Sequence, residues 1–279
     1  MDIISYAEAK KARAASNRAL ASVKSPVTTP DDYTWTDHPL VGKLFVDQHG
    51  RYTSTLDPTT RKYSGGGVTY YVDSVAGNDA NTGLSDAQAL AKITTAVQKS
   101  DAETIMVKGN GPATPYYRGR GLNNDQVNKH INMIKYGTDV PYITTHDLLT
   151  YTLASGYTYT YQTTRSSVSE VVDMVGAAGG AGVKLIQVSS IDACEAVQGS
   201  WYQNGSTLYV HASDSRNLVT TQPSRIWALL AVTNFTNSGD FTTYLEGLVF
   251  YGGVDTVLAS CTSSAGATFT AVNVETGYS

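Results

Sequence analysis

Residues 69–97 constrain the fold of this chain more than any other stretch. A short run of β-branched and aromatic residues at 68–72 leads into a loop rich in Gly, Asn and Asp at 77–83. Those loop residues tolerate positive φ or bond to their own backbone. Residues 87–99 carry apolar side chains three and four positions apart, which predicts a helix of about three turns. A second apolar strand follows at 104–107. This order of elements suits a cap, which covers the open end of a stack of coils.

The composition favours a mainly β protein. The chain has 279 residues, enough for one large β domain or two ordinary ones, and it holds 25 Gly and 19 Tyr. Only 16% of the residues are charged, the net charge is −4, and no basic block occurs. Binding to nucleic acid therefore has no electrostatic support. No apolar run approaches the roughly 20 residues that a membrane span requires.

The cap segment resembles the N-terminal entry of right-handed parallel β-helix proteins of the pectate-lyase-like class. That class includes many bacteriophage tailspikes and secreted polysaccharide-degrading enzymes. The resemblance is carried by residues 70–73, 77–79 and 81–83 and by the apolar face from Ile93 to Val97. It implies a mainly β fold, namely a right-handed parallel β-helix with an N-terminal cap at its start.

Two segments precede the cap. Residues 1–25 are rich in good helix formers, with Ile4, Ala7, Ala14 and Ala21 at heptad-like spacing. The predicted N-terminal α-helix either attaches the protein to a virus particle and trimerises, or frays without a partner. Residues 26–66 read as a linker and a small β neck with a hairpin, ended by a flexible glycine run. The residues predicted for virion attachment are Ile3, Ile4, Tyr6 and Ala7.

The β-helix itself is predicted in two parts. Residues 67–147 hold the cap and the first coils, and the step from Ile105 to Ile134 fits one coil of 20–30 residues. Residues 226–279 hold further coils, which begin with an apolar strand at 226–231. We find no second cap after Val274, so we expect the stack to be unfinished and the chain to be the N-terminal part of a longer protein.

Residues 148–225 do not read as coils. Tyr and Thr alternate at period two over 150–164, a short helix is predicted at 167–175, and Asn204-Gly205 separates two β runs. Asn-Gly between such runs is a strong hairpin signal. The segment resembles an inserted β module found in some phage and bacterial β-helix proteins.

Aromatic residues of this module are candidates for carbohydrate binding. Aromatic rings can stack on sugar rings through apolar burial. The alternative is that the same rings pack the small core of the module. The predicted binding residues are Trp201, Tyr202 and Tyr209, and the nearby Tyr157, Tyr159 and Tyr161 could extend their surface.

Other polar residues allow two interpretations each. The oxygens of Asp73, Asn78, Asp79 and Asn81 could bind Ca²⁺ or cap turns. Acids on the coils could serve glycoside hydrolysis or simply be exposed, and no spacing pairs them. Catalytic residues therefore stay unassigned, and we predict no metal site and no cofactor. The acids in question are Glu246, Asp255 and Glu275.

The cysteines and histidines carry no clear functional signal. The two cysteines, Cys194 and Cys261, read as free thiols or as one bridge. The histidines are predicted to be surface or turn residues, and they are His38, His49, His130, His146 and His211.

The leading functional hypothesis is a virion tailspike or receptor-binding protein. The resemblance implies a homotrimer that binds a host-surface polysaccharide and could also degrade it, with residues 1–66 attached to other virion proteins of the tail or baseplate. No secretion signal is evident, so we expect the protein outside the cell as part of the virion. One alternative is a free extracellular polysaccharide lyase or glycoside hydrolase of the same class. Another is a structural adaptor whose coils are only scaffold.

Overall fold

The computed structural model describes residues 24–26, 44–47, 52–54, 57–122, 127–175, 182–221, 223–252, 257–260 and 268–277. The chain divides into two compact units, residues 1–60 and 61–279. Strands predominate among the described elements, which confirms the prediction of a mainly β protein. No helix in these ranges is long and apolar enough to cross a membrane. The predicted N-terminal helix and its attachment residues Ile3, Ile4, Tyr6 and Ala7 lie outside the described residues.

The first unit contains a small antiparallel sheet in the order β1-β2-β3. The predicted hairpin in the neck is confirmed, because Phe45 of β2 pairs with Thr53 of β3. The strand β1 was not predicted and pairs with the other edge of β2. The 3-10 turn η1 (Pro58–Arg61) follows the sheet. The strands are β1 (Lys24–Pro26), β2 (Leu44–Asp47) and β3 (Tyr52–Ser54).

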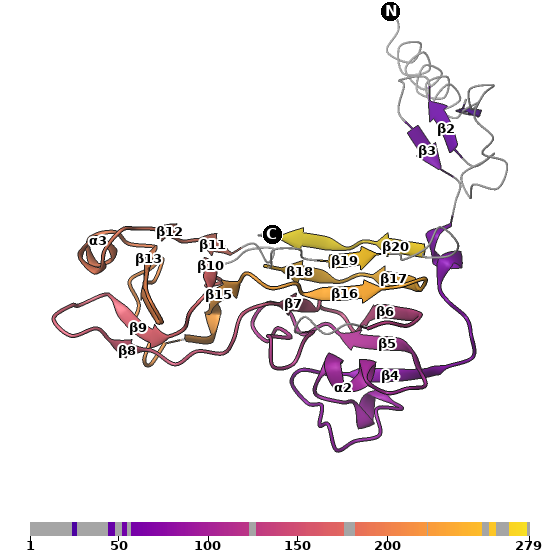
Figure 1. Cartoon of the computed structure of the whole chain (residues 1–279), viewed down its shortest axis with the longest axis horizontal. Coiled ribbons are helices and arrows are strands. Elements are labelled where there is room, and N and C mark those ends of the chain that lie inside the picture. The colour runs from indigo at the N-terminus through magenta and orange to yellow at the C-terminus, as the bar shows by residue number, and fades with distance from the viewer. Residues whose placement is uncertain are drawn as a thin grey trace, which may run out of the picture. The chain divides into compact units, whose positions relative to one another are not determined.

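The second unit is built on a parallel sheet of five strands in the order β20-β17-β6-β5-β4, which lie above one another in Figure 1. One row of paired residues crosses the sheet from Tyr70 through Ile105 and Met133 to Leu245. All four side chains are buried, so the row forms a continuous apolar core. The strands are β4 (Val68–Val72), β5 (Ala102–Lys108), β6 (Ile131–Tyr136), β17 (Thr242–Glu246) and β20 (Thr268–Val272).

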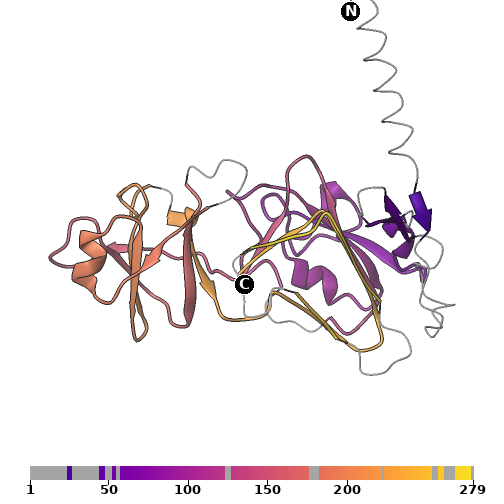
Figure 2. The same cartoon turned by 90° about the horizontal axis from the view of Figure 1, so that it is seen from above.

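Two further parallel sheets accompany the first. They join β7, β18 and β21 in one case and β16 and β19 in the other. The order β16-β17-β18 recurs as β19-β20-β21, and Thr242 pairs with Thr268 and Val249 with Glu275, a step of 26 residues in both cases. Figure 2 shows the later strands superposed on one another. The strands are β7 (Tyr142–Thr144), β16 (Phe235–Ser238), β18 (Val249–Tyr251), β19 (Val257–Ser260) and β21 (Glu275–Gly277).

The cap helix is shorter than predicted. The segment forms a 3-10 turn, η2 (Asp86–Gln88), and a short helix, α2 (Ile93–Val97). Between them Leu90 is extended, because its N–H donates to the carbonyl of Tyr71 and its own carbonyl accepts from the N–H of Asp73. Pairing with β4 therefore overrides the helical spacing of the apolar residues. Leu90 and Ile93 are still buried in the core that the cap covers.

The segment before β4 lies against the outer side of the main sheet. The amide of Asn132 accepts from the N–H of Tyr63 at 2.9 Å and donates to its carbonyl at 3.0 Å. The ring of Tyr63 stacks on His130 with centroids 4.1 Å apart. The N–H groups of Gly65 and Gly67 both donate to the carboxylate of Glu103, so the glycine run predicted to be flexible is held by hydrogen bonds.

The inserted module has an antiparallel core. Its main sheet has the order β12-β13-β14-β9-β8, in which only the β12–β13 pair is parallel. The predicted hairpin is confirmed, because Asn204 pairs with Thr207 across Gly205. One short helix packs on the hairpin. The elements are β8 (Thr152–Leu153), β9 (Tyr161–Thr164), β12 (Ile186–Gln187), α3 (Ile191–Ala196), β13 (Ser200–Asn204) and β14 (Thr207–His211).

A second sheet of the module corrects one prediction. The helix predicted at 167–175 is wrong, since this segment is strand β10 (Val168–Asp173). It pairs antiparallel with β15 (Ile226–Leu230), an apolar strand as predicted, and Trp227 and Leu229 of β15 also belong to a buried cluster with Tyr142 and Val249 of the parallel sheets. The short strand β11 (Val183–Lys184) lies on the other side of β10, and the 3-10 turn η4 (Pro223–Arg225) precedes β15.

Candidate functional site

The hairpin β13–β14 presents two tyrosines side by side on one face of the module. Tyr202 and Tyr209 are directly paired across the hairpin, and their rings stack with centroids 5.9 Å apart at 19°. Successive side chains of a strand alternate between faces, so Leu208 and Val210 point the other way and are buried in the module core. The hairpin therefore keeps one apolar face and one face of partly exposed aromatic rings.

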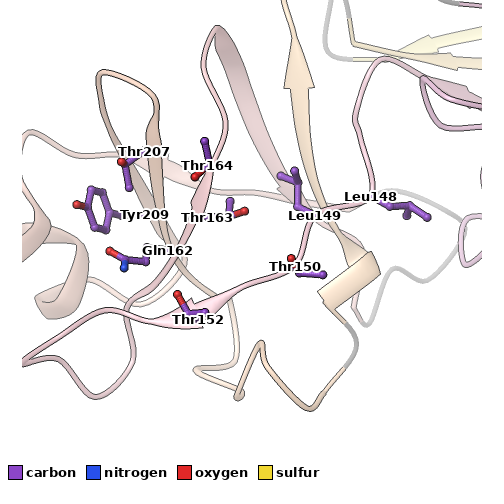
Figure 3. Close-up of a pocket in the computed structure, with 9 residues that line it drawn as sticks. All are labelled: Leu148, Leu149, Thr150, Thr152, Gln162, Thr163, Thr164, Thr207 and Tyr209. Carbon is purple, nitrogen blue, oxygen red and sulfur yellow. The ribbon is translucent and has the colours of Figure 1, made fainter.

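A cavity of about 480 Å³ lies beside these tyrosines, between β14, β9 and the chain that leads into β8 (Figure 3). The cavity follows from the local pairing. Strand β8 pairs with β9 only at two positions, Thr152 with Gln162 and Leu153 with Tyr161, and residues 148–150 then diverge from the sheet. The lining residues are Leu148, Leu149, Thr150, Thr152, Gln162, Thr163, Thr164, Thr207 and Tyr209.

The chemistry of the lining is uncharged and rich in hydroxyl groups. Threonine hydroxyls and the Gln162 amide can both donate and accept hydrogen bonds. Tyr209 adds the face of an aromatic ring and lies next to Gln162, its partner across the sheet. A concave surface with a few polar groups and one aromatic wall can bind a neutral ligand that carries both hydroxyls and apolar C–H faces.

The structure separates the three predicted carbohydrate-binding residues. Tyr209 lines the cavity and Tyr202 stacks against it. Trp201 is only 3% exposed and packs in the module core, so its ring is not available to a ligand and takes the alternative role of core packing. A role for Tyr202 and Tyr209 in binding stays a prediction.

The other three tyrosines of the module occupy three different environments. Tyr161 is buried in the core, whereas the Tyr157 hydroxyl donates to Asp192 at 2.7 Å. Tyr159 is 46% exposed and stacks on His211 with centroids 5.4 Å apart. Their loop is fixed by Glu195 of α3, whose carboxylate accepts from the N–H groups of residues 158–160. Burial alone would raise the pKa of Glu195, but these hydrogen bonds outweigh it and the pKa is lowered.

The oxygen-rich cap loop serves turns. Asp73 accepts from the N–H groups of Val75 and Ala76, and Asn78 from that of Ala80. Asp79 accepts from two further N–H groups, and Asn81 donates to the carbonyl of Ala89. Burial would raise the pKa of Asp73, but its hydrogen bonds and Lys108 lower it overall. Within the described ranges no group of three His, Cys, Asp or Glu could hold a metal.

Two of the acids considered for catalysis come together in a second cavity, of about 400 Å³. Glu246 and Glu275 both line it, together with Lys135 and Tyr142. Glu246 accepts from the Tyr244 hydroxyl at 2.9 Å and pairs with Lys62 at 2.9 Å. Burial raises the pKa of Glu246 less than these two partners lower it, so its carboxylate is ionised at neutral pH. Asp255 lies outside the described residues.

Two histidines are buried, contrary to the expectation of surface or turn positions. His146 bonds to the Thr144 hydroxyl at 2.6 Å and stacks on Trp227. Burial lowers the pKa of His146 to about 3. His211 is 3% exposed. His130 accepts from the N–H of Thr242, while His38 and His49 lie outside the described part of the chain. Cys194 is a buried free thiol, and Cys261 is not among the described residues.

Most of the cavity wall was not predicted from the sequence. The period-two pattern at 150–164 did indicate a strand with two different faces, and it pointed to the tyrosines. The cavity is instead lined by residues 162–164 of β9 and by Thr207 and Tyr209 of the facing strand. Only the pairing of β9 with β14, more than forty residues apart in sequence, brings these positions together.

Comparisons with known proteins identify no relative. No family model matches the chain, and searches of curated proteins and of solved structures return no significant match.

Proposed function

We propose that this chain is a glycan-binding virion protein of the tailspike type, with its binding site on the inserted module. The observation that carries the proposal is the uncharged, hydroxyl-rich cavity with Tyr209 on its wall and Tyr202 stacked beside it. Sugars combine hydroxyl groups with apolar ring faces, so such a cavity is complementary to a neutral saccharide.

The architecture that we propose for the rest is a right-handed parallel β-helix. It is supported by the three parallel sheets, by the recurring order of strands, and by the 26 residues that separate paired positions in β17 and β20 and in β18 and β21. A rigid stack of this kind would hold the module at a fixed position beside the coils. Extracellular location, a homotrimer and attachment to other virion proteins through residues 1–66 belong to the same proposal and rest on the sequence resemblance.

Binding can be tested on an array of neutral and acidic bacterial surface oligosaccharides. We expect neutral glycans to be retained. Tyr209→Ala should weaken the binding of a retained glycan by about tenfold, equivalent to about 1.4 kcal/mol, whereas Tyr209→Phe should keep most of it because the ring face remains. Phe269→Ala is a matched control, since it removes an exposed aromatic ring from the coils. Equal binding by all four proteins would refute the proposal.

The virion role has its own test. The oligomeric mass in solution is measured for the full chain and for a chain that lacks residues 1–66. A trimer that dissociates on deletion supports an assembly and attachment role. A monomer in both cases contradicts it, even if glycan binding is intact.

A second candidate function is polysaccharide cleavage by a free enzyme. Its specific support is the cavity that contains both Glu246 and Glu275. Two carboxylates beside a sugar can act as acid and base or nucleophile. This function predicts that the full chain releases reducing ends from a polysaccharide and that Glu275→Gln abolishes the release. Unchanged turnover by that variant would exclude this cavity as the active site.

A further inference from the structure

A serine and a histidine at the end of β14 have the geometry of a nucleophile and its base. The Oγ of Ser215 lies 2.8 Å from Nε2 of His211. The other ring nitrogen, Nδ1, lies 3.0 Å from the carbonyl oxygen of Cys194. A carbonyl oxygen can only accept, so Nδ1 carries the hydrogen and Nε2 keeps its lone pair. The hydroxyl of Ser215 is therefore the donor, and His211 is oriented to take its proton.

The backbone at Ser215 is unusual for a serine. Its φ is +56°, in the left-handed region that favours glycine. The turn is closed by a hydrogen bond from the N–H of Ser215 to the carbonyl of Ala212 at 3.1 Å. A residue with a Cβ is held in this conformation at a cost of roughly 1 kcal/mol or more. The conformation keeps the hydroxyl on the imidazole, and Ser215 remains partly exposed.

His211 lies on the same face of β14 as two residues of the proposed glycan site. Thr207, Tyr209 and His211 occupy alternate positions of β14 and so lie on one face of the sheet. Thr207 and Tyr209 line the cavity. His211 follows Tyr209 by two residues, a distance of about 7 Å along a strand. The exposed ring of Tyr159 covers the imidazole by stacking on it.

We propose that Ser215 and His211 form an esterase dyad that removes O-acyl groups from a glycan. Ser215 Oγ attacks the ester carbonyl carbon as its proton passes to His211 Nε2. The bond from that carbon to the sugar oxygen breaks, and the sugar oxygen takes the proton from Nε2. Water then hydrolyses the acyl-serine, giving the free carboxylic acid and the original serine.

The test uses the full chain and two probes that need no glycan, 4-nitrophenyl acetate and a fluorophosphonate, which phosphonylates activated serines with loss of fluoride. The decisive variant is Ser215→Gly, which removes the nucleophile and relaxes the left-handed backbone, so the fold is retained. Ser206→Ala is the matched control, because it removes a serine hydroxyl from the exposed turn of the β13–β14 hairpin. Circular dichroism and thermal unfolding confirm that all three proteins are folded.

We expect the fluorophosphonate to modify the peptide that contains Ser215, and kcat/KM for the ester to fall about 100-fold or more in Ser215→Gly but not in Ser206→Ala. A merely structural hydrogen bond predicts no labelling and equal hydrolysis by all three proteins, and either result overturns the proposal. Because both probes lack a sugar, a negative result leaves the glycan-binding proposal standing. Failure of the glycan array would likewise leave the dyad intact.

Discussion

The parallel sheets of the second unit, called the coils below after the proposed β-helix, and the inserted module are both β structures, but they are stabilised in different ways. In the coils, parallel strands align one apolar residue per strand, as in the row from Ile105 through Met133 to Leu245. Each residue of that row is fully buried. The module instead buries a charged pair, in which Asp173 receives two hydrogen bonds from Arg216 at 2.7 and 2.8 Å.

The coils are stabilised by interactions that recur from strand to strand, whereas the module is stabilised by interactions that occur once. In the coils, each strand makes similar apolar contacts with the strand on either side, so the loss of one contact affects mainly those neighbours. The module depends on single contacts between residues distant in sequence, such as Asp173 with Arg216 and Glu195 with residues 158–160. The two regions share one buried cluster, in which Trp227 and Leu229 of β15 lie with Tyr142 and Val249 of the parallel sheets. We infer that the exposed face with Tyr202 and Tyr209 can vary for binding while the parallel strands keep their spacing, because that face lies outside this cluster.

The largest effect is expected from Arg216→Met. The side chain of Asp173 is fully buried, and burial would raise its pKa, but Arg216 and Ser213 outweigh burial and hold it below the ordinary value. Removing Arg216 leaves a buried carboxylate without its counter-charge, so the free energy of unfolding should fall by about 3–5 kcal/mol. Urea unfolding followed by tryptophan fluorescence measures the change.

The double variant Asp173→Asn, Arg216→Met is the control for that prediction. It removes both charges and should recover much of the lost stability. If the single and double variants were equally unstable, shape rather than charge would be responsible. The comparison of the two regions would then lose its electrostatic basis.

The next effect belongs to the coils. Leu245→Ala removes a fully buried side chain from the apolar row and should cost about 2–5 kcal/mol. Because the neighbours Met133 and Ala271 pair with it on either side, we expect hydrogen exchange to accelerate in β6 and β20 and to stay unchanged in β13 and β14. Faster exchange in the module would show that the two regions unfold together.

Much of this organisation could be predicted from the sequence because its signals are local. Strand propensity and turn residues located the cap strands, the coil strands and the Asn204-Gly205 hairpin. The failures involve distant partners. The segment at 167–175 has an apolar pattern that suits a helix or a buried strand, and only pairing with β15 decides for a strand. In the cap, Leu90 leaves the predicted helix because β4 offers it backbone partners.

The candidate site was harder to predict than the fold. Tyr202 and Tyr209 are partners because the Asn-Gly turn fixes the register of the hairpin, and their role in binding stays a prediction. Trp201 was misplaced because the sequence does not show which face of the hairpin is covered. The contact of Ser215 with His211 depends on a left-handed serine and on the position of α3, and neither has a local signal.

A pH-dependent effect lies where β7 of the coils ends and β15 of the module begins. His146 stacks on Trp227 of β15, and its pKa is lowered to about 3 because burial disfavours the charged ring. Below its ordinary pKa of about 6.5 the unfolded chain binds a proton that the folded protein does not. Stability is therefore complete above about pH 6.5 and declines as the pH falls toward 3.

By pH 5 the loss from His146 should reach about 2 kcal/mol. Urea midpoints at pH 7 and pH 5 measure it, and His146→Gln should remove most of the difference. Asp173, with its lowered pKa, acts in the same direction only at lower pH, as the carboxyl of the unfolded chain becomes protonated near pH 4. A difference between pH 7 and pH 5 that survives in His146→Gln would assign it to another group.

The smallest effect is expected at the turns that follow two paired strands of the coils. Gly247 and Asn273 follow the paired strands β17 and β20 at the same position, with φ of +68° and +50°. A Cβ on Gly247 would lie 2.9 Å from the Cβ of Lys135. Gly247→Ala should therefore cost about 1–2 kcal/mol, from the left-handed backbone and from this contact.

Gly247→Asn separates these two causes, because asparagine tolerates the left-handed region but still carries the Cβ. If the backbone conformation dominates, Gly247→Asn is more stable than Gly247→Ala, as Asn273 in the next coil suggests. Equal losses would mean that the contact with Lys135 dominates and that the coils are not interchangeable at this corner. The repeated character assigned to the coils would then hold for their apolar rows but not for their turns.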